Sequence, residues 1–276
     1  MSARTLLAPG PFRAEHIREG SPYELSDGHP ILCMPTGRRG GRSNLIGGEV
    51  LETDPAVKSA GVDVGFSKDP SHLRAPDVSV GDFANEPGWA PGAPPLAVEY
   101  ADTGHDEAEL QKKIAELLGA GTKHLWVVRL VGPRRVEIHE PGKPMRLAKP
   151  GESLTAPGIL KNAVPVLALY DRDAAHEATL RNLLQRRGYE SLDAVRAEAG
   201  AEGRLEGSRE GLFAVLKARG LGVSAEERAQ ILAARELDLL QRWIAQATIA
   251  GTTADALAAP PGRRAMPRKA RRPAGA

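Results

Sequence analysis

The chain has 276 residues, of which 41% are hydrophobic and 26% are charged, values typical of a globular protein with one large domain or two small ones. No apolar run approaches the length needed to cross a bilayer, and Leu6–Ala8 is too short for the hydrophobic region of a signal peptide. Cys33 is the only cysteine, which excludes an intrachain disulfide and agrees with a reducing compartment. We therefore expect a cytoplasmic protein that does not enter a membrane.

The net charge is unevenly distributed along the chain. After Asp255 there is no acidic residue, and six bases follow. The formal charge is +2 with these bases and −4 without them, so the body of the protein is mildly acidic. We predict that this Ala/Pro/Arg-rich end, residues 258–276, is a disordered basic tail. The six bases are Arg263, Arg264, Arg268, Lys269, Arg271 and Arg272.

A β-hairpin is predicted over residues 23–34. Two runs that contain apolar residues flank Asp27-Gly28, a dipeptide typical of a tight β-turn. Cys33 lies in the second run among aliphatic side chains, so we expect it to be a buried structural thiol. Glu24 lies in the first run and is either a surface carboxylate or an acid directed toward a site formed by the fold.

A segment rich in glycine and arginine follows at residues 35–44, and we interpret it as a flexible basic loop. Its bases Arg38, Arg39 and Arg42 suit phosphate, because a guanidinium presents a planar fork of donors to oxyanions. They are candidate nucleic-acid-binding residues, and the alternative is a solvated turn. Helical spacing of apolar residues predicts a helix next, over residues 43–58.

Short apolar strands dominate the next part of the chain. Alternation predicts a strand at residues 62–66, and further strands are expected at 76–80 and 96–100. Asp77 lies at the start of the second of these strands, and Glu99 is the only charge in the third. A carboxylate inside a buried strand is costly unless it is paired or bound to a cation.

A helix is predicted from the polar turn at residues 102–106 to about Ala120, with Gly121 as its C-cap. At about 100° per residue, the apolar side chains of this helix gather on one face. Lys112 points away from that face, whereas Lys113 lies at its border. The stem of a border lysine can lie along a sheet while its ammonium reaches a site at the strand ends.

The remaining chain changes in texture near residue 170. Before residue 170, strands are expected at 124–130 and 135–139. After residue 170, glycine and proline become rare, and helices are expected at 174–187, 201–219 and 225–250. A Glu-Gly repeat at residues 202–211 predicts a weak helix or a hinge, because glycine costs about 1 kcal/mol per helical position. We thus divide the chain into a domain over residues 1–170, a helical accessory segment over 171–257 and the tail.

Two carboxylates on neighbouring strands and a lysine on the following helix predict a site for a hard cation. Asp77 and Glu99 would supply oxygen ligands for Mg²⁺ or Mn²⁺, and such an ion can activate a bound water. Lys113 would orient that water or stabilise negative charge on a phosphate. Each residue also has a simpler explanation: a capping aspartate for Asp77, a salt bridge for Glu99, and an ion pair with Glu109 or Glu116 for Lys113.

Five short motifs follow one another over roughly residues 10–170. They are Tyr23-Glu24-Leu25-x-Asp27-Gly28, Ala75-Pro76-Asp77-Val78-Ser79-Val80, Ala97-Val98-Glu99, Lys113-x3-Leu117-x3-Gly121 and Leu125-Trp126-Val127-Val128. Together they resemble the Uma-two family of restriction endonuclease-like proteins, which is part of the PD-(D/E)XK nuclease superfamily.

The resemblance implies an α/β fold with a restriction-endonuclease-like mixed β-sheet flanked by helices, followed in this chain by the helical C-terminal segment. It also implies Mg²⁺-dependent hydrolysis of DNA phosphodiester bonds. Asp77 and Glu99 would be the metal ligands, Glu24 the acid from the early segment, and Lys113 the catalytic lysine. The superfamily's usual lysine lies two residues after the second acid, where this chain has Ala101, and similar relatives carry it on the following helix.

Two other interpretations remain open. The chain could be a non-catalytic nucleic-acid-binding module that keeps the nuclease fold, with affinity from the arginine segment and the tail through counterion release. It could also be a protein-interaction module in which the amphipathic residues 231–249 form a homodimer. Packing of those residues within the same chain is the simpler arrangement.

Overall fold

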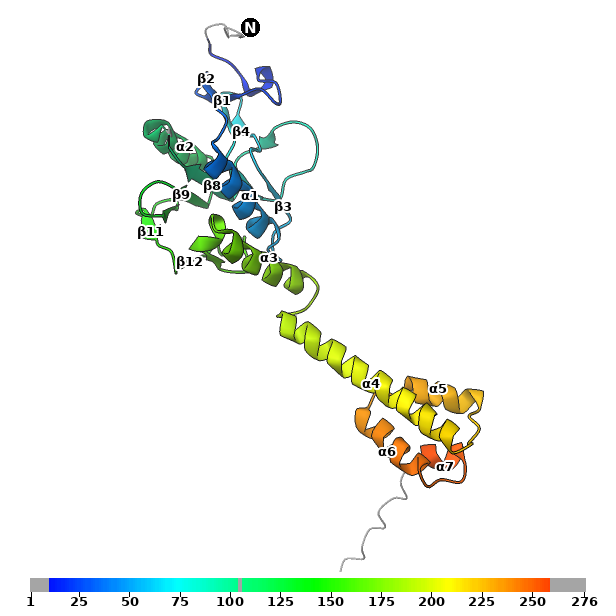
Figure 1. Ribbon diagram of the computed structural model, residues 1–276. Helices are drawn as coiled ribbons and strands as arrows, with labels where there is room; N and C mark the ends of the chain where they lie inside the picture. Colours follow the sequence, from blue (N-terminus) through cyan, green and yellow to red (C-terminus); the bar gives the residue numbers. More distant parts are fainter. Residues whose placement is uncertain (1–9, 104–105, 259–276) are drawn as a thin grey trace, which may run out of the picture. The chain divides into compact units, whose positions relative to one another are not determined.

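The computed structural model describes residues 10–103 and 106–258. They form two compact units, divided between Leu192 and Asp193 (Figure 1). The sequence placed this division at residue 170, but α3 (Arg172–Arg186) packs against α1 (Arg38–Glu52) in the first unit. The predicted tail lies outside the described residues apart from Ala258. Within the described ranges, no helix is long and apolar enough to span a bilayer.

A six-stranded sheet in the order β11-β10-β9-β8-β6-β3 is the centre of the first unit. β8 and β9 run parallel, and the other neighbouring strands are antiparallel, so the predicted mixed sheet is confirmed. The crossover between the parallel strands is a helix, as this connection usually requires. The strands are β3 (Ser59–Gly61), β6 (Val78–Gly81), β8 (Leu96–Ala101), β9 (His124–Arg129), β10 (Arg135–His139) and β11 (Arg146–Ala148).

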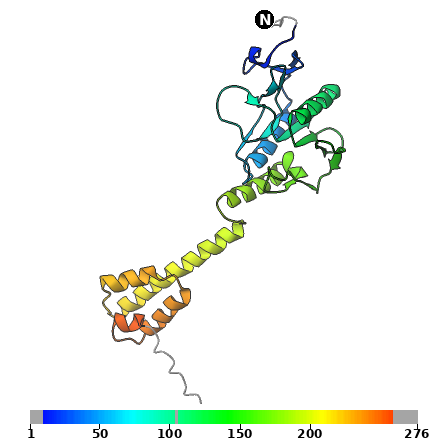
Figure 2. The same cartoon turned by 180° about the vertical axis from the view of Figure 1, so that it is seen from behind.

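Helices α1 and α2 (Glu107–Ala120) cover opposite faces of this sheet (Figure 1 and Figure 2). Val98 belongs to the hydrophobic core on the α1 side, whereas its neighbour Ala97 belongs to the core under α2. Alternate side chains of a strand therefore enter different cores. Cover on both faces explains why every residue of β8 is buried and why its sequence is almost continuously apolar.

A second sheet, in the order β2-β1-β5-β4-β7, carries the early acid Glu24. Its small core contains Leu25 and Leu73, covered by Ile17 near the 3-10 helix η1 (Ala14–His16). The strands are β1 (Tyr23–Ser26), β2 (His29–Leu32), β4 (Phe66–Asp69), β5 (His72–Arg74) and β7 (Ala90–Pro91). A two-stranded ribbon and a 3-10 helix complete the unit: β12 (Ser153–Leu154), β13 (Val164–Pro165) and η2 (Val166–Leu169).

The predicted hairpin is confirmed, but the strand predicted at residues 62–66 is wrong. Asp27 and Gly28 both have positive φ, at 50° and 74°, as a tight turn between β1 and β2 requires. Asp63 also has a positive φ, at 53°, which ends the extended conformation between β3 and β4. An alternating pattern at 62–66 therefore belongs to a connection between two strands.

The predicted basic loop at residues 35–44 is also wrong, because α1 begins at Arg38. The glycines that indicated a loop belong to a helix that packs closely on its neighbours. A Cβ on Gly47 would overlap the hydroxyl group of Tyr100 in β8, and that hydroxyl donates a hydrogen bond of 3.0 Å to the carbonyl of Leu169. Glycine here permits close approach of the helix to the sheet.

Cys33 is exposed, so the prediction of a buried thiol is wrong. It follows β2, which is the edge strand of the second sheet. The apolar neighbours Leu32 and Met34 are exposed as well, at 55% and 75%. The apolar run that indicated burial therefore lies on an edge with little to cover it.

The second unit is a helical bundle with its own core. Its helices are α4 (Leu192–Ala218), α5 (Ala225–Ala233), α6 (Leu237–Ala247) and α7 (Thr253–Leu257). Leu212, Ile231, Leu240 and Trp243 are buried together, so the amphipathic face predicted at 231–249 is used within this unit. The helix predicted over 225–250 is two helices, and the Glu-Gly repeat lies inside the continuous α4.

Candidate active site

Lys113 is held between two acids that come from different strands. Its Nζ lies 2.9 Å from Oε1 of Glu99 and 3.1 Å from Oε1 of Glu24. It also donates a hydrogen bond of 2.7 Å to the carbonyl oxygen of Ala75. The Lys113 side chain is 13% exposed, whereas Lys112 is open to solvent. The orientation that helical phase predicted for these two lysines is confirmed.

Glu99 is the most buried acid of this group, with 3% of its side chain exposed. Burial raises its pKa to about 8; the ammonium of Lys113 acts in the opposite direction, while the charges of Asp77 and Glu24 add to the increase. Burial also opposes the charge of Lys113, but the nearby Glu24 and Glu99 outweigh it and raise the pKa of this ammonium. Loss of hydration is thus the main reason why the charged form of Glu99 is disfavoured.

Asp77 is fixed against the sheet beside Glu99. Its Oδ2 accepts a hydrogen bond of 2.6 Å from the backbone N–H of Tyr100, and its Oδ1 accepts one of 3.3 Å from Nδ2 of Asn44. Val78 pairs with Val98 across the sheet, so Asp77 and Glu99 lie at the same level of neighbouring strands. The two candidate metal ligands therefore share one end of the strand pair β6/β8.

Arg74 joins three acids in a network that the sequence did not indicate. Its side chain is 4% exposed and lies 3.0 Å from Glu24, 2.7 Å from Glu109 and 2.5 Å from Glu116. Burial acts to raise the pKa of Glu24, but the charges of Lys113 and Arg74 outweigh it and lower that pKa. Glu109 and Glu116 are thus paired with Arg74, and Lys113 is directed to Glu24 and Glu99 instead of to its own helix.

One sequence signal could have found Arg74. Arg74 is a charged residue that follows the buried Leu73 at the end of β5 and directly precedes Ala75-Pro76-Asp77. A charge next to a buried residue and to a candidate ligand indicates a paired side chain. Two further residues near the acids were also missed: Asn44, which contacts Asp77 from α1, and Asp63 in the β3–β4 connection. Loss of hydration raises the pKa of Asp63 and the charge of Asp77 adds to this, so Asp63 lies in the electrostatic field of the same cluster.

The three arginines of the predicted loop lie in the first turns of α1. Arg39 forms an ion pair with Asp102, with 2.9 Å between Nε and Oδ2. Arg38 and Arg42 are exposed. The same helix carries Asn44, so its first turns lie on the side of the sheet where Asp77 is held.

Ala101 fills the position where the superfamily's lysine is expected. It lies on the same face of β8 as Glu99, because side chains two residues apart in a strand point the same way. Ala101 is 4% exposed and packs in the core under α2 with Leu110 and Ile114. Because α2 covers this face of the sheet, its Lys113 can reach Glu99.

A separate group of three side chains could also hold a metal ion. Ligand atoms of Asp27, His72 and Glu116 lie within 4.8 Å of one another, and in the described part of the chain this is the only such group of three. Glu116 already accepts hydrogen bonds from Arg74 and Ser26. Glu24, Asp77 and Glu99 do not form such a group of three, and the ammonium of Lys113 contacts both Glu24 and Glu99.

The donor set around Asp77 and Glu99 fits a hard divalent cation. Both ligands are carboxylates, and one lies on each of two adjacent strands. Burial is the main cause of the raised pKa of Glu99, and the charges of Asp77 and Glu24 add to it, so a cation beside these carboxylates would favour the charged form of Glu99. Mg²⁺ and Mn²⁺ prefer such oxygen donors and tolerate a site completed by waters.

Comparison with known proteins relates this chain to nucleases. The model of a protein family described as "Uma2: Putative restriction endonuclease" matches residues 12–169, which include all four candidate residues. Among solved structures, the chain is similar to a protein from Anabaena variabilis described as a "putative nuclease belonging to DUF820". The two share 16% identity with a TM-score of 0.49, over 60% of this chain and 99% of the other. No match was found among curated proteins.

Proposed function

The chain belongs to the Uma2 family of restriction endonuclease-like proteins, and from this we propose that it is a metal-dependent endonuclease that hydrolyses DNA phosphodiester bonds. The observation that supports this proposal is the position of Lys113 between Glu24 and Glu99, at the strand end that also carries Asp77. These side chains come from four separate segments of the chain. A buried lysine beside a concentration of acids is a typical feature of a catalytic site.

Each residue has a role that follows from its surroundings. Asp77 and Glu99 would hold Mg²⁺ or Mn²⁺, which when bound lowers the pKa of a coordinated water and neutralises charge on the phosphate. Lys113 remains protonated because its pKa is raised, so its ammonium can donate hydrogen bonds to the attacking water or to a phosphate oxygen. Glu24 positions that ammonium from the side of β1.

The first turns of α1 would contact the DNA backbone. Arg38 and Arg42 are exposed, and a helix start favours anions through its free N–H groups and its dipole. Arg39 is shared with Asp102 and would contribute less. Two phosphate contacts would give a slope of about −1.8 in a plot of log affinity against log salt, which the double variant Arg38→Ala/Arg42→Ala should lose.

Nicking of supercoiled plasmid tests the proposed activity. Wild-type protein with Mg²⁺ or Mn²⁺ should nick, and Asp77→Asn, Glu99→Gln and Lys113→Met should each lower the rate by about 100-fold or more. Lys112→Met is the matched control, because it removes the same charge from the exposed side of the same helix and should leave the rate unchanged. Nicking that survives the first three substitutions would contradict the assignment.

One observation favours a second candidate, a non-catalytic DNA-binding module. Lys113 already has three acceptors, and both oxygens of Asp77 accept hydrogen bonds, so these contacts can also be explained as a structural ion-pair cluster. This candidate predicts salt-sensitive DNA binding in the presence of EDTA, with no nicking when metal is added. Such a module could act as a homodimer, and light scattering of the full chain would report its mass.

A further inference from the structure

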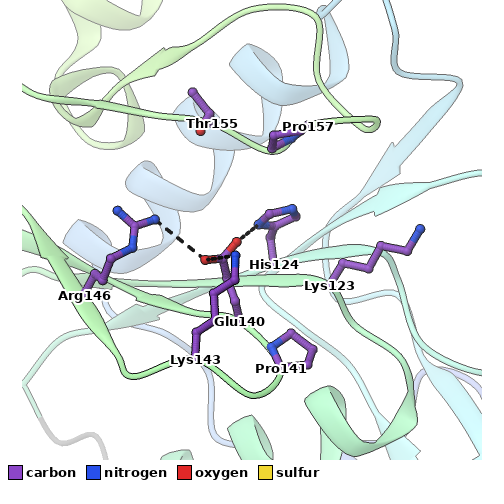
Figure 3. A pocket seen from close by; sticks show the side chains of 8 residues that line it. All are labelled: Lys123, His124, Glu140, Pro141, Lys143, Arg146, Thr155 and Pro157. Carbon is purple, nitrogen blue, oxygen red and sulfur yellow. Dashed lines mark hydrogen bonds and ion pairs between the residues drawn. The ribbon is translucent and has the colours of Figure 1, made fainter.

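A basic pocket lies on the first unit, at the end of the central sheet where β9 begins. It has a volume of about 510 Å³. One wall comes from the first residues of β9, the floor from the β10–β11 connection, and the opposite wall from the segment around Thr155 and Pro157 (Figure 3). Lys123, Lys143 and Arg146 line the pocket, so two separate segments of the sequence supply its three cationic side chains.

The single acid of the pocket does not neutralise these cations. Glu140 lies 3.1 Å from His124, 3.2 Å from Lys143 and 3.8 Å from Arg146, so one carboxylate is shared among three partners (Figure 3). In the described residues, Lys123 forms no ion pair, although it lines the same pocket.

His124 adds no charge to this balance at neutral pH. It is 8% exposed, and burial lowers its pKa; Glu140 acts in the opposite direction. The three cations and the one carboxylate therefore leave an excess of two positive charges among the residues that line the pocket. Lys143 and Arg146 are each 63% exposed, so their side chains can turn toward a ligand at little cost.

The pocket is separate from the candidate active site. His124 pairs with Leu96, which lies three residues before Glu99 on β8, about 10 Å away along the strand. His124 also alternates with Leu125, whose side chain faces α2, so it lies on the other face of the sheet from Glu99. No residue of the pocket belongs to the Lys113 cluster or to the Arg74 network.

We propose that this pocket binds the phosphate group of a nucleotide or of a nucleic-acid end. Two lysines and an arginine supply point charges and a planar fork of donors, which are the groups that proteins use for phosphate. An excess of two positive charges matches a phosphate monoester, which carries nearly two negative charges near pH 7. A simple carboxylate would leave one of them unbalanced.

The lining also indicates which part of the ligand is recognised. Pro141 and Pro157 are its apolar members, and the only aromatic ring in the lining is that of His124. His124 is 8% exposed and lies 3.1 Å from Glu140, so its ring offers little open face for stacking a base. The volume lies in the range of small-ligand sites and is sufficient for a mononucleotide. The phosphate therefore dominates recognition, and discrimination among bases is expected to be weak.

Isothermal titration calorimetry on the full chain in EDTA tests this proposal with inorganic phosphate, dAMP and deoxyadenosine as probes. Phosphate and dAMP should bind and deoxyadenosine should not. Lys143→Ala/Arg146→Ala should weaken binding of dAMP by at least about tenfold, because two charge-assisted contacts are lost. Lys149→Ala is the control, since this exposed lysine lies next to β11 but outside the pocket, and affinity should stay within about twofold.

Glu140→Gln provides a variant that misfolding cannot mimic. It removes the competing carboxylate while keeping the size of the side chain, so dAMP should bind more tightly than to the wild type. Absence of saturable binding of phosphate and dAMP to the wild type would overturn the proposal. Unchanged affinity in the double variant, or weaker binding by Glu140→Gln, would overturn it as well.

A tetranucleotide with and without a 5′-phosphate distinguishes the two sources of the phosphate group. Stronger binding of the phosphorylated oligonucleotide than of dAMP assigns the pocket to nucleic-acid ends, and the reverse assigns it to free nucleotides. Because the titration is done without metal and also with Asp77→Asn, its result does not depend on nuclease activity. Failure of the proposed function and failure of this inference can therefore be told apart.

Discussion

Replacement of Arg74 by methionine tests whether its buried network stabilises the first unit. One guanidinium, 4% exposed, contacts Glu24, Glu109 and Glu116 at 3.0, 2.7 and 2.5 Å. Its removal leaves three carboxylates without a partner that they share, a change that costs about 3–5 kcal/mol when the acids are fully buried. Glu24 keeps Lys113 and Glu109 is 32% exposed, so we expect about 3 kcal/mol at pH 7, or roughly 6–12 °C in Tm.

The pH dependence of this loss follows from the shifted acids. The pKa values of Glu24 and Glu116 are lowered from 4.5 in the folded protein, where burial acts to raise them but their basic and hydrogen-bonding partners outweigh it. A lowered pKa gives stability that is present above the unfolded value and is lost as pH falls through the folded value. Arg74→Met removes this contribution, so the difference from the wild type should be largest above about pH 5 and should shrink toward pH 3.

Urea unfolding followed by circular dichroism at pH 7 and pH 3.5 measures both effects. Arg39→Met is the matched control, because Arg39 is 46% exposed and has one acidic partner, Asp102, and ion pairs of exposed side chains contribute little. A loss below about 1 kcal/mol for Arg74→Met at pH 7 would refute the reasoning. An equal loss at the two pH values would refute the electrostatic account and leave only packing.

Three further predictions concern other parts of the chain. Gly47→Ala should destabilise the first unit by about 1–3 kcal/mol in urea unfolding, because the Cβ of the alanine would overlap the Tyr100 hydroxyl. Gly119→Ala in α2 is the control: position 119 faces open space, so this substitution should be neutral or stabilising. Mn²⁺ should raise Tm more at pH 9 than at pH 6.5 in thermal scans, because below a pKa of about 8 the cation must displace a proton from Glu99. Equal increases in Tm at the two pH values would contradict the assignment of Glu99 as a metal ligand. Deletion of residues 193–276 should leave the Tm of the first unit unchanged in calorimetry, since the second unit has its own core.

Local sequence patterns predicted the parts of the site that depend on one element. Helical phase separated Lys113 from Lys112, and a single charge in an apolar strand indicated that Glu99 needs a partner. The role of Arg74 could not be predicted in this way, because its three partners come from β1 and α2 and meet only in the folded chain.

The errors at α1 and at residues 62–66 have a related cause. In α1, Gly47 is needed where the helix approaches Tyr100, a contact with a strand about 50 residues away in sequence, and a Cβ on Gly40 would overlap the side chain of Thr36. Composition alone assigns such glycines to a loop. At 62–66 the alternation is real, but the positive φ of Asp63 ends the strand, and no pattern of hydrophobicity reports a backbone angle.

The position of Lys113 is defined by the sheet face that α2 covers and by the contacts that hold α2 in place. Ala101 lies beneath α2 on the face of Glu99, and a small side chain there lets the helix approach closely enough for Lys113 to reach Glu99 at 2.9 Å. Arg74 binds the same helix through Glu109 and Glu116 and also holds Glu24. Rotation of α2 by even one residue would break these pairs together with those of Lys113. The Arg74 network therefore sets the orientation of the helix, and through it the position of the lysine, without entering the site itself.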